Sequence, residues 1–269
     1  MKRFRLLLVL VAVVLAVTVS VSLGATRASA GKGDKVVVEP GKKVQIAVPV
    51  SGEFGAGYLE GIGNAVAMAV AMHPTVRGFP VQLNTTVSAA CLDPTGEKAV
   101  AEGIVSNTQN TGVIGPFCSS GARYSLPVYE AAGVVVISGS TQAVDLPAFA
   151  PTVFNRTLVE QLPGQPSGWF VTVSGLPSVK RWTEYHAAFP PAAATSEYDA
   201  FYFDAATLLL DRLQQVSTIK DGNLVIDRKE LAKAVRQTTE FPGVTCTTTL
   251  DPATGNRSND PASLARCAG

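Results

Sequence analysis

Two serines and a glycine, Ser119-Ser120-Gly121, stand where a helix is expected to begin. The first N–H groups of a helix have no partner inside it, and the helix dipole places partial positive charge at that end. Such an end attracts a carboxylate, and the hydroxyl of Ser119 adds another donor. Alternatively, Ser119 or Ser120 only caps the helix, as serines commonly do. The pattern predicts one of these two roles.

A second set of polar side chains follows the apolar run at residues 134–137. Ser140 and Thr141 stand directly after this expected strand, where their hydroxyls could contact a ligand. The alternative is turn chemistry, because serine and threonine in loops often bond their own backbone.

Catalysis is not expected. Cys118 beside two serines could suggest a nucleophile, but a nucleophile needs a base such as histidine within reach. His73 follows a helix and is expected at the end of the sheet where the strands begin, and His186 lies in a distant segment bounded by prolines. The chain has no G-x-S-x-G elbow, and the glycines at residues 55–63 lack the dinucleotide-binding spacing. We therefore expect neither an enzyme nor a cofactor.

The elements that would position these groups alternate between apolar strands and amphipathic helices. Strands are expected at residues 44–50, 80–87, 111–115 and 133–137, and helices at 58–72, 93–108 and 119–132, with Asp93 as a cap. Alternation with short loops predicts an α/β fold with a doubly wound parallel sheet. Such sheets bind ligands at the carboxyl ends of their strands, where the loops 51–58, 117–121 and 138–143 would lie.

The alternation breaks after Arg156. Beyond it we expect a strand at residues 169–173, helices at 182–189, 197–215 and 227–237 (the last capped by Asp227), a strand at 245–250 and an exposed loop at 251–259. The aromatic residues at the start of the helix 197–215 are expected to pack on the sheet instead of forming a binding platform; they are Tyr198, Phe201, Tyr202 and Phe203.

The amino-terminal residues have the pattern of an export signal. A short basic segment precedes an apolar run at residues 6–23, and Ala28-Ser29-Ala30 has the small side chains that signal peptidase requires. We expect cleavage after Ala30, which would place the product in the periplasm or outside the cell. The alternative is an uncleaved anchor, because the run is near the length of about 18 residues that spans a bilayer.

Charge argues against nucleic acid as a partner. The chain has 22 Lys and Arg against 21 Asp and Glu, and removal of residues 1–30 takes away four basic residues and no acid, leaving a net charge of −3. No basic stripe remains to hold a phosphate backbone. Residues 31–43, rich in glycine and lysine, are expected to be a mobile leader.

Four cysteines remain in an exported chain, and an even number favours disulfides. Chain order suggests the pairs Cys91–Cys118 and Cys246–Cys267. The spacings lack the paired form of a zinc site, so a metal is not expected.

Several sequence segments together resemble the periplasmic leucine/isoleucine/valine-binding protein family, which has the type 1 periplasmic binding fold. They are IAVPVSGEFGAGYLEG, CLDP, VIGPFCSSG, PVYEAAGVVVISGSTQAVDL, VFNRT, SGWFVTVSGLP and YDAFYFDAATLLLDRL. The resemblance implies a receptor whose two α/β lobes close over an amino acid or a similar small polar ligand and then dock on a membrane ABC transporter. It also implies a Cys91–Cys118 disulfide in the first lobe.

The resemblance implies roles for individual residues. Ser119 matches a residue that holds the ligand carboxylate. Ser140 and Gln142 lie where the family's loop contacts the ligand, with Thr141 between them, and Gln142 departs from the usual Thr or Ser. Tyr58 matches an aromatic residue near the ligand side chain.

The chain departs from the family where the second lobe is expected. Residues 44–157 resemble the first lobe, 158–168 form a linker in place of the second lobe, 169–242 return to the first lobe, and 243–269 form a disulfide-bearing remnant. Two hypotheses follow: a substrate-binding protein that serves an ABC transporter, or an interaction or sensory module that keeps the lobe without tight ligand binding. A homodimer could supply the missing wall of the cleft.

Overall fold

The computed structural model describes residues 34–51, 56–88, 91, 93–140, 152–154, 199–245, 247–252 and 255. At residues 56–59, 87–88 and 152–154 it describes the backbone alone.

The main sheet has six strands in the order β3-β4-β2-β5-β6-β7. Five of them are parallel: β2 (Val44–Ser51), β4 (Phe79–Ser88), β5 (Asn110–Ile114), β6 (Val135–Ser138) and β7 (Thr152–Phe154). The short β3 (Thr75–Val76) forms one edge of the sheet and pairs antiparallel with β4. β2, the first strand of this sheet in the sequence, lies inside it, and the later strands add on both sides of β2, which confirms the doubly wound parallel sheet.

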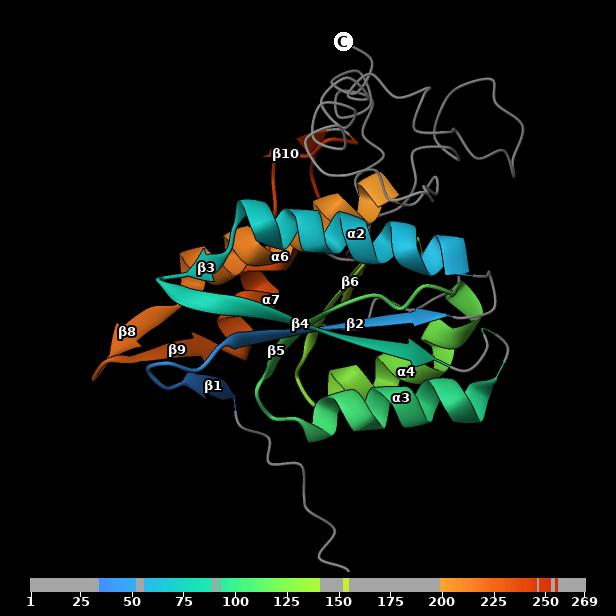
Figure 1. Cartoon of the computed structure of the whole chain (residues 1–269), viewed down its shortest axis with the longest axis horizontal. Coiled ribbons are helices and arrows are strands. Elements are labelled where there is room, and N and C mark those ends of the chain that lie inside the picture. The colour runs from blue at the N-terminus through green and yellow to red at the C-terminus, as the bar shows by residue number, and fades with distance from the viewer. Residues whose placement is uncertain are drawn as a thin grey trace, which may run out of the picture.

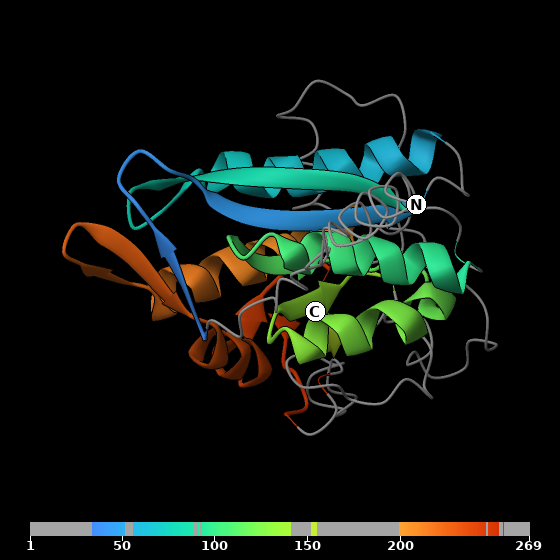
Figure 2. The ribbon, with the colours of Figure 1, turned by 90° about the horizontal axis from the view of Figure 1, so that it is seen from below.

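Helices cover both faces of this sheet (Figure 1). One face carries α2 (Ala56–Met72) and α6 (Asp199–Val216), with α7 (Arg228–Arg236) packed beside α6. The other carries α3 (Pro94–Ser106) and α4 (Ser119–Ala131), which lie side by side in Figure 2. Strand β2 is buried at every residue except Gln45, because Ile46 and Val48 pack in the core with α2 and α6, whereas Ala47 packs with α3 and α4. A parallel strand covered on both faces must be apolar along its length, as this one largely is.

A small antiparallel sheet of β1 (Lys35–Val38), β9 (Asn223–Asp227) and β8 (Thr218–Lys220) stands at one end of the molecule. The expectation of a mobile leader is wrong for residues 35–38, because Val36 and Val38 are buried there and pair with Ile226 and Leu224. The β8–β9 hairpin was not predicted from the sequence. Its signal was present in Asp221-Gly222, two residues with positive φ at the turn, as a two-residue hairpin requires.

The expected helix caps are confirmed in two places and wrong in a third. Asp93 accepts a hydrogen bond from the backbone N–H of Thr95 at 3.0 Å, and Asp227 accepts from Lys229 and Glu230. The cap position of α4, however, is Cys118, which forms no side-chain cap. The serines that follow it already lie inside the helix, so neither occupies the capping position.

The carboxyl-terminal part is joined to α6 by a buried carboxylate. Asp204 accepts hydrogen bonds from the N–H groups of Val244 and Thr245 and from the Thr245 hydroxyl. Thr245 is therefore held at α6, and the strand expected at residues 245–250 shrinks to β11 (Thr247–Thr248), which pairs with β10 (Phe241–Pro242).

The packing role expected for the aromatic residues of α6 is confirmed for Phe201, Tyr202 and Phe203, which are all buried. Tyr198 and the elements expected at residues 169–173 and 182–189 lie outside the described residues, as does most of the loop expected at 251–259.

Candidate functional site

Three parallel strands end in serine at the same edge of the main sheet. Ser51 ends β2, Ser88 ends β4 and Ser138 ends β6, and Ser51 is paired with Ser88 in the strand register. Strand β5 ends at Ile114, and the loop after it leads directly into α4. We call these strand ends, the loop 115–118 and the start of α4 the carboxyl edge. Ligands of doubly wound sheets bind at this edge, which makes it the candidate binding site.

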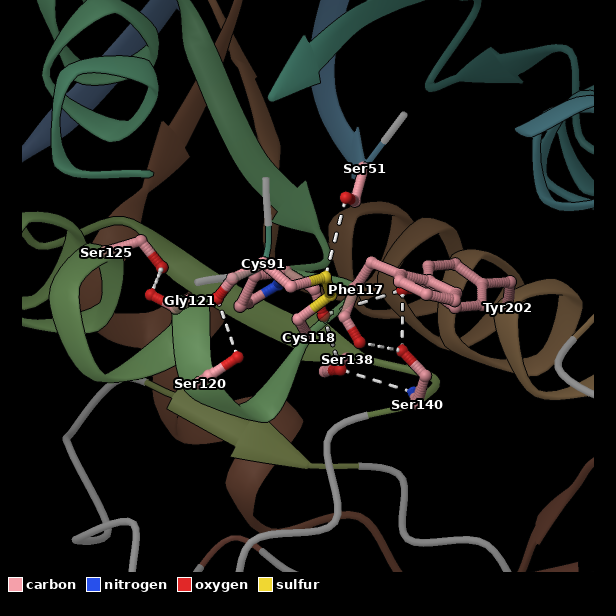
Figure 3. The surroundings of a disulfide bond; sticks show 11 residues. Ser51, Cys91, Phe117, Cys118, Ser120, Gly121, Ser125, Ser138, Ser140 and Tyr202 are labelled. Carbon is pink, nitrogen blue, oxygen red and sulfur yellow. Dashed lines mark hydrogen bonds between the residues drawn. A yellow bond between two sulfur atoms is a disulfide. The ribbon is translucent and has the colours of Figure 1, made fainter. Parts of the chain in front are cut away.

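A disulfide between Cys91 and Cys118 ties two loops of the carboxyl edge together (Figure 3). Beside it, the Ser120 hydroxyl donates to the Cys91 carbonyl oxygen at 2.6 Å, and Ser51 Oγ lies 3.4 Å from Cys91 Sγ. The loop after β4 is thus fixed to both β2 and α4. The predicted Cys91–Cys118 pair is confirmed, whereas the predicted Cys246–Cys267 pair lies outside the described residues.

A buried hydroxyl network joins β6 to the β5–α4 loop (Figure 3). Ser138 Oγ donates to the Pro116 carbonyl oxygen at 2.9 Å, and Ser140 Oγ donates to that of Phe117 at 2.6 Å. The Tyr202 hydroxyl lies 3.0 Å from Ser140 Oγ. Since the single proton of Ser140 goes to Phe117, the Tyr202 hydroxyl is left to donate to Ser140 Oγ, and it also lies 3.5 Å from the Pro116 carbonyl oxygen, a longer and weaker contact. The Ser140 side chain therefore shapes the edge, and its direct contact with a ligand stays a prediction.

Tyr202 brings α6 into close contact with the same loops. Its ring stacks on Phe117, with centroids 6.4 Å apart. A Cβ atom on Gly139 would lie 2.7 Å from Cδ2 of Tyr202, so only glycine fits between β6 and α6 at this position. The network is nearly dry, because Ser140 is 7% exposed and Tyr202 is fully buried.

A buried acid lies beside the first turn of α4. Glu97 of α3 is 4% exposed, and a Cβ atom on Gly121 would lie 2.8 Å from its carboxyl carbon. The positive end of α4 is therefore shared with a carboxylate of the protein itself, which lowers the electrostatic gain for a ligand carboxylate. Burial, with a smaller contribution from Glu97, also raises the pKa of Tyr129.

The predicted ligand residues are only partly within the described structure. Ser119 is half-buried as the first residue of α4, and Tyr58 lies in the first turn of α2 with its side chain not described. Thr141 and Gln142 lie outside the described residues. The structure also places Ser51, Phe117 and Tyr202 at the carboxyl edge, and none of the three was predicted as a site residue. The strand-end position of Ser51 could have indicated it, whereas Tyr202 gave no signal beyond core spacing.

Within the described part of the chain, no group of three or more His, Cys, Asp or Glu side chains is placed to hold a metal ion. Among the helices that the structure describes, none is both long and apolar enough to cross a membrane.

The fold is that of solute-binding proteins of ABC transporters. A substrate-binding protein from Sphaerobacter thermophilus matches with a TM-score of 0.61 and 10% identity, covering 80% of this chain and 91% of that one. A branched-chain amino acid substrate-binding protein from Streptococcus pneumoniae in complex with isoleucine gives 0.59 and 14%, covering 80% and 94%. A solute-binding protein from R. palustris in complex with 4-hydroxybenzoate gives 0.57 and 13%, covering 80% and 90%.

No protein-family model matches the sequence, and no curated protein matches it. At these identities the structural likeness establishes the fold: the described residues form a lobe of the type 1 periplasmic binding fold, as in the branched-chain amino acid substrate-binding proteins.

Proposed function

We propose that this chain is an extracytoplasmic substrate-binding protein for an amino acid or a similar small polar ligand, which it delivers to an ABC transporter. The observation that carries the proposal is the carboxyl edge, where serine-ended strands meet the start of α4 and a disulfide holds the loops in place. Fixed hydroxyl and backbone donors on rigid elements suit the recognition of a small carboxylate.

Five residues are proposed to contact the ligand: Tyr58, Ser119, Ser140, Thr141 and Gln142. Ser119 is central among them, because its N–H group and hydroxyl lie at the start of α4. The solute-binding proteins of the same fold are named for binding amino acids or aromatic acids, which supports a binding protein over an enzyme. Export through the signal at residues 1–30 would bring this chain to the compartment where such proteins act.

The second candidate function is an interaction or sensory module that keeps the lobe without tight ligand binding. Two observations favour it: the Ser140 proton is committed to Phe117, and Glu97 shares the positive end of α4. The reduction of the second lobe at residues 158–168 and the homodimer stay predictions. A single lobe would leave one side of the ligand in water, so its affinity would be weak, about millimolar to micromolar.

A thermal melt of residues 31–269 with each common amino acid, and with hydroxybenzoates, separates the two functions. A ligand at 100 times its dissociation constant adds about 2.7 kcal/mol to the stability of the folded state. The proposal predicts a selective rise of the melting temperature that Ser119→Ala abolishes and that Ser106→Ala, at the far end of α3, leaves intact. A cooperative melt that no ligand shifts would favour the interaction module.

A further inference from the structure

Carboxamide side chains cluster at the end of the sheet opposite the carboxyl edge. Gln82, Gln45 and Asn110 are in register across the neighbouring strands β4, β2 and β5. Asn84 follows on β4, and Asn107 stands at the end of α3. All of them except Gln82 line a surface hollow of about 570 Å³ between the sheet and α3, here called the amide hollow. Its lining consists of Gln45, Ala47, Asn84, Thr86, Ala99, Val100, Gly103, Ile104, Asn107 and Asn110.

Hydrogen bonds fix the orientation of the central amide. Gln45 Oε1 accepts from Asn84 Nδ2 at 3.0 Å and from Asn107 Nδ2 at 2.8 Å. Because two donors converge on this oxygen, the NH₂ group of Gln45 must occupy the other position of its amide plane. Asn110 is buried and donates to the Ile104 carbonyl oxygen, which anchors the network to α3.

The Gln45 NH₂ group has no hydrogen-bond partner among the residues that the structure describes. Gln45 is half-buried, and its NH₂ group is not among the buried polar atoms that lack a partner in the described residues, so water in the open hollow can reach it and a ligand could replace that water. Polar groups held in one orientation at a concave surface are the usual starting point of a recognition site.

Small side chains in its wall leave the amide hollow open. Ala99 and Gly103 lie one turn apart on α3, and Ala47 lies on β2, so the wall recedes where larger side chains would fill it. A Cβ atom on Gly103 would meet nothing within 4 Å, which shows that the glycine is not required by packing. Glycine inside a helix costs about 1 kcal/mol relative to alanine, so the open space is kept at some cost in stability.

We propose that the amide hollow binds a neutral, hydroxyl-rich ligand such as a monosaccharide or a polyol. Carboxamides both donate and accept hydrogen bonds, and so do hydroxyl groups. None of the lining residues carries a charge, so an ionic ligand would lose its hydration without compensation. The apolar wall of Ala47, Val100 and Ile104 suits the C–H faces of a sugar ring, and the volume lies within the usual range for small-ligand sites.

Titration of residues 31–269 with D-glucose, D-galactose, D-ribose and myo-inositol tests the proposal, with binding read by calorimetry and by the melting temperature. We expect at least one of the four to bind. Gln45→Met keeps the shape of the side chain but removes its amide, and Gly103→Leu fills the hollow. Each should weaken binding at least tenfold. The matched control is Gly63→Leu in α2, where an added Cβ atom also meets nothing within 4 Å.

The Ser119→Ala variant separates this site from the carboxyl edge, because a probe bound at that edge would lose affinity in it. Ser119→Ala should leave sugar binding unchanged. The proposal is overturned if none of the four probes binds, or if binding survives both Gln45→Met and Gly103→Leu in correctly folded variants.

Discussion

Asp204 offers a direct test of how the carboxyl-terminal part is held to the lobe. Its carboxylate is 3% exposed and accepts hydrogen bonds from Val244 N at 2.7 Å, from Thr245 N at 3.0 Å and from the Thr245 hydroxyl. Asp204→Ala would remove the acceptor of all three and leave the donors in an apolar surrounding.

The expected loss follows from the cost of unsatisfied donors. Each buried donor left without a partner costs about 1–3 kcal/mol, and partial entry of water keeps the sum below three full penalties. We expect Asp204→Ala to lower the free energy of unfolding by about 4 kcal/mol, a large share of the 5–15 kcal/mol typical of a folded domain. Urea denaturation followed by circular dichroism measures this loss.

The matched control is Asp211→Ala on the same helix. Asp211 is 51% exposed and contacts Arg212 at the surface, so its loss should change stability by less than about 0.5 kcal/mol. If Asp204→Ala costs no more than this control, the Asp204 carboxylate does not hold Val244 and Thr245 to α6.

Three further predictions concern the lobe. Tyr202→Phe removes the hydroxyl that bonds Ser140 and should lower the free energy of unfolding, measured in urea, by about 1 kcal/mol. This loss should disappear when Ser140 is already alanine, whereas equal losses in both backgrounds would show that the two hydroxyls are not coupled. Replacement of Cys91 and Cys118 by serine should cost about 3.5 kcal/mol, because the bridge spans 27 residues; an unchanged midpoint would contradict this. Burial raises the pKa of Tyr129 above its value near 10 in the unfolded chain, so the folded protein keeps the phenol neutral at a pH where the unfolded chain ionises. The free energy of unfolding therefore falls as pH rises above 10, by at most about 1.4 kcal/mol per pH unit. Tyr129→Phe should reduce the alkaline loss between pH 10 and 11, and an identical pH profile would exclude this cause.

The sequence was sufficient to predict the sheet and most of its helices, because their hydrophobic periods are long and regular. Asp93 and Asp227 were predictable as caps since each stands directly before its helix. The β8–β9 hairpin was missed although Asp221-Gly222 indicates a tight turn. The leader was misjudged at residues 35–38 because the partner strand of β1 is almost 190 residues away in the chain.

The candidate site was predictable only where chemistry is local. The Cys91–Cys118 pair and the helix start at Ser119 follow from spacing and residue type. The contact of Tyr202 with Ser140 spans 62 residues, and helical spacing marks Tyr202 only as a core residue. The position of Glu97 beside α4 likewise depends on how α3 packs against α4, which no local pattern gives.

The proposed function requires that a small polar ligand such as an amino acid binds at the carboxyl edge. Amide proton–nitrogen correlation spectra of residues 31–269, recorded during titration with the ligand that most raises the melting temperature, test it most directly. We expect saturable shifts of the backbone amides at residues 51, 117–121 and 138–140, with those of α7 unchanged. Shifts confined to other parts of the chain, or none with any amino acid or hydroxybenzoate at millimolar concentration, would contradict it.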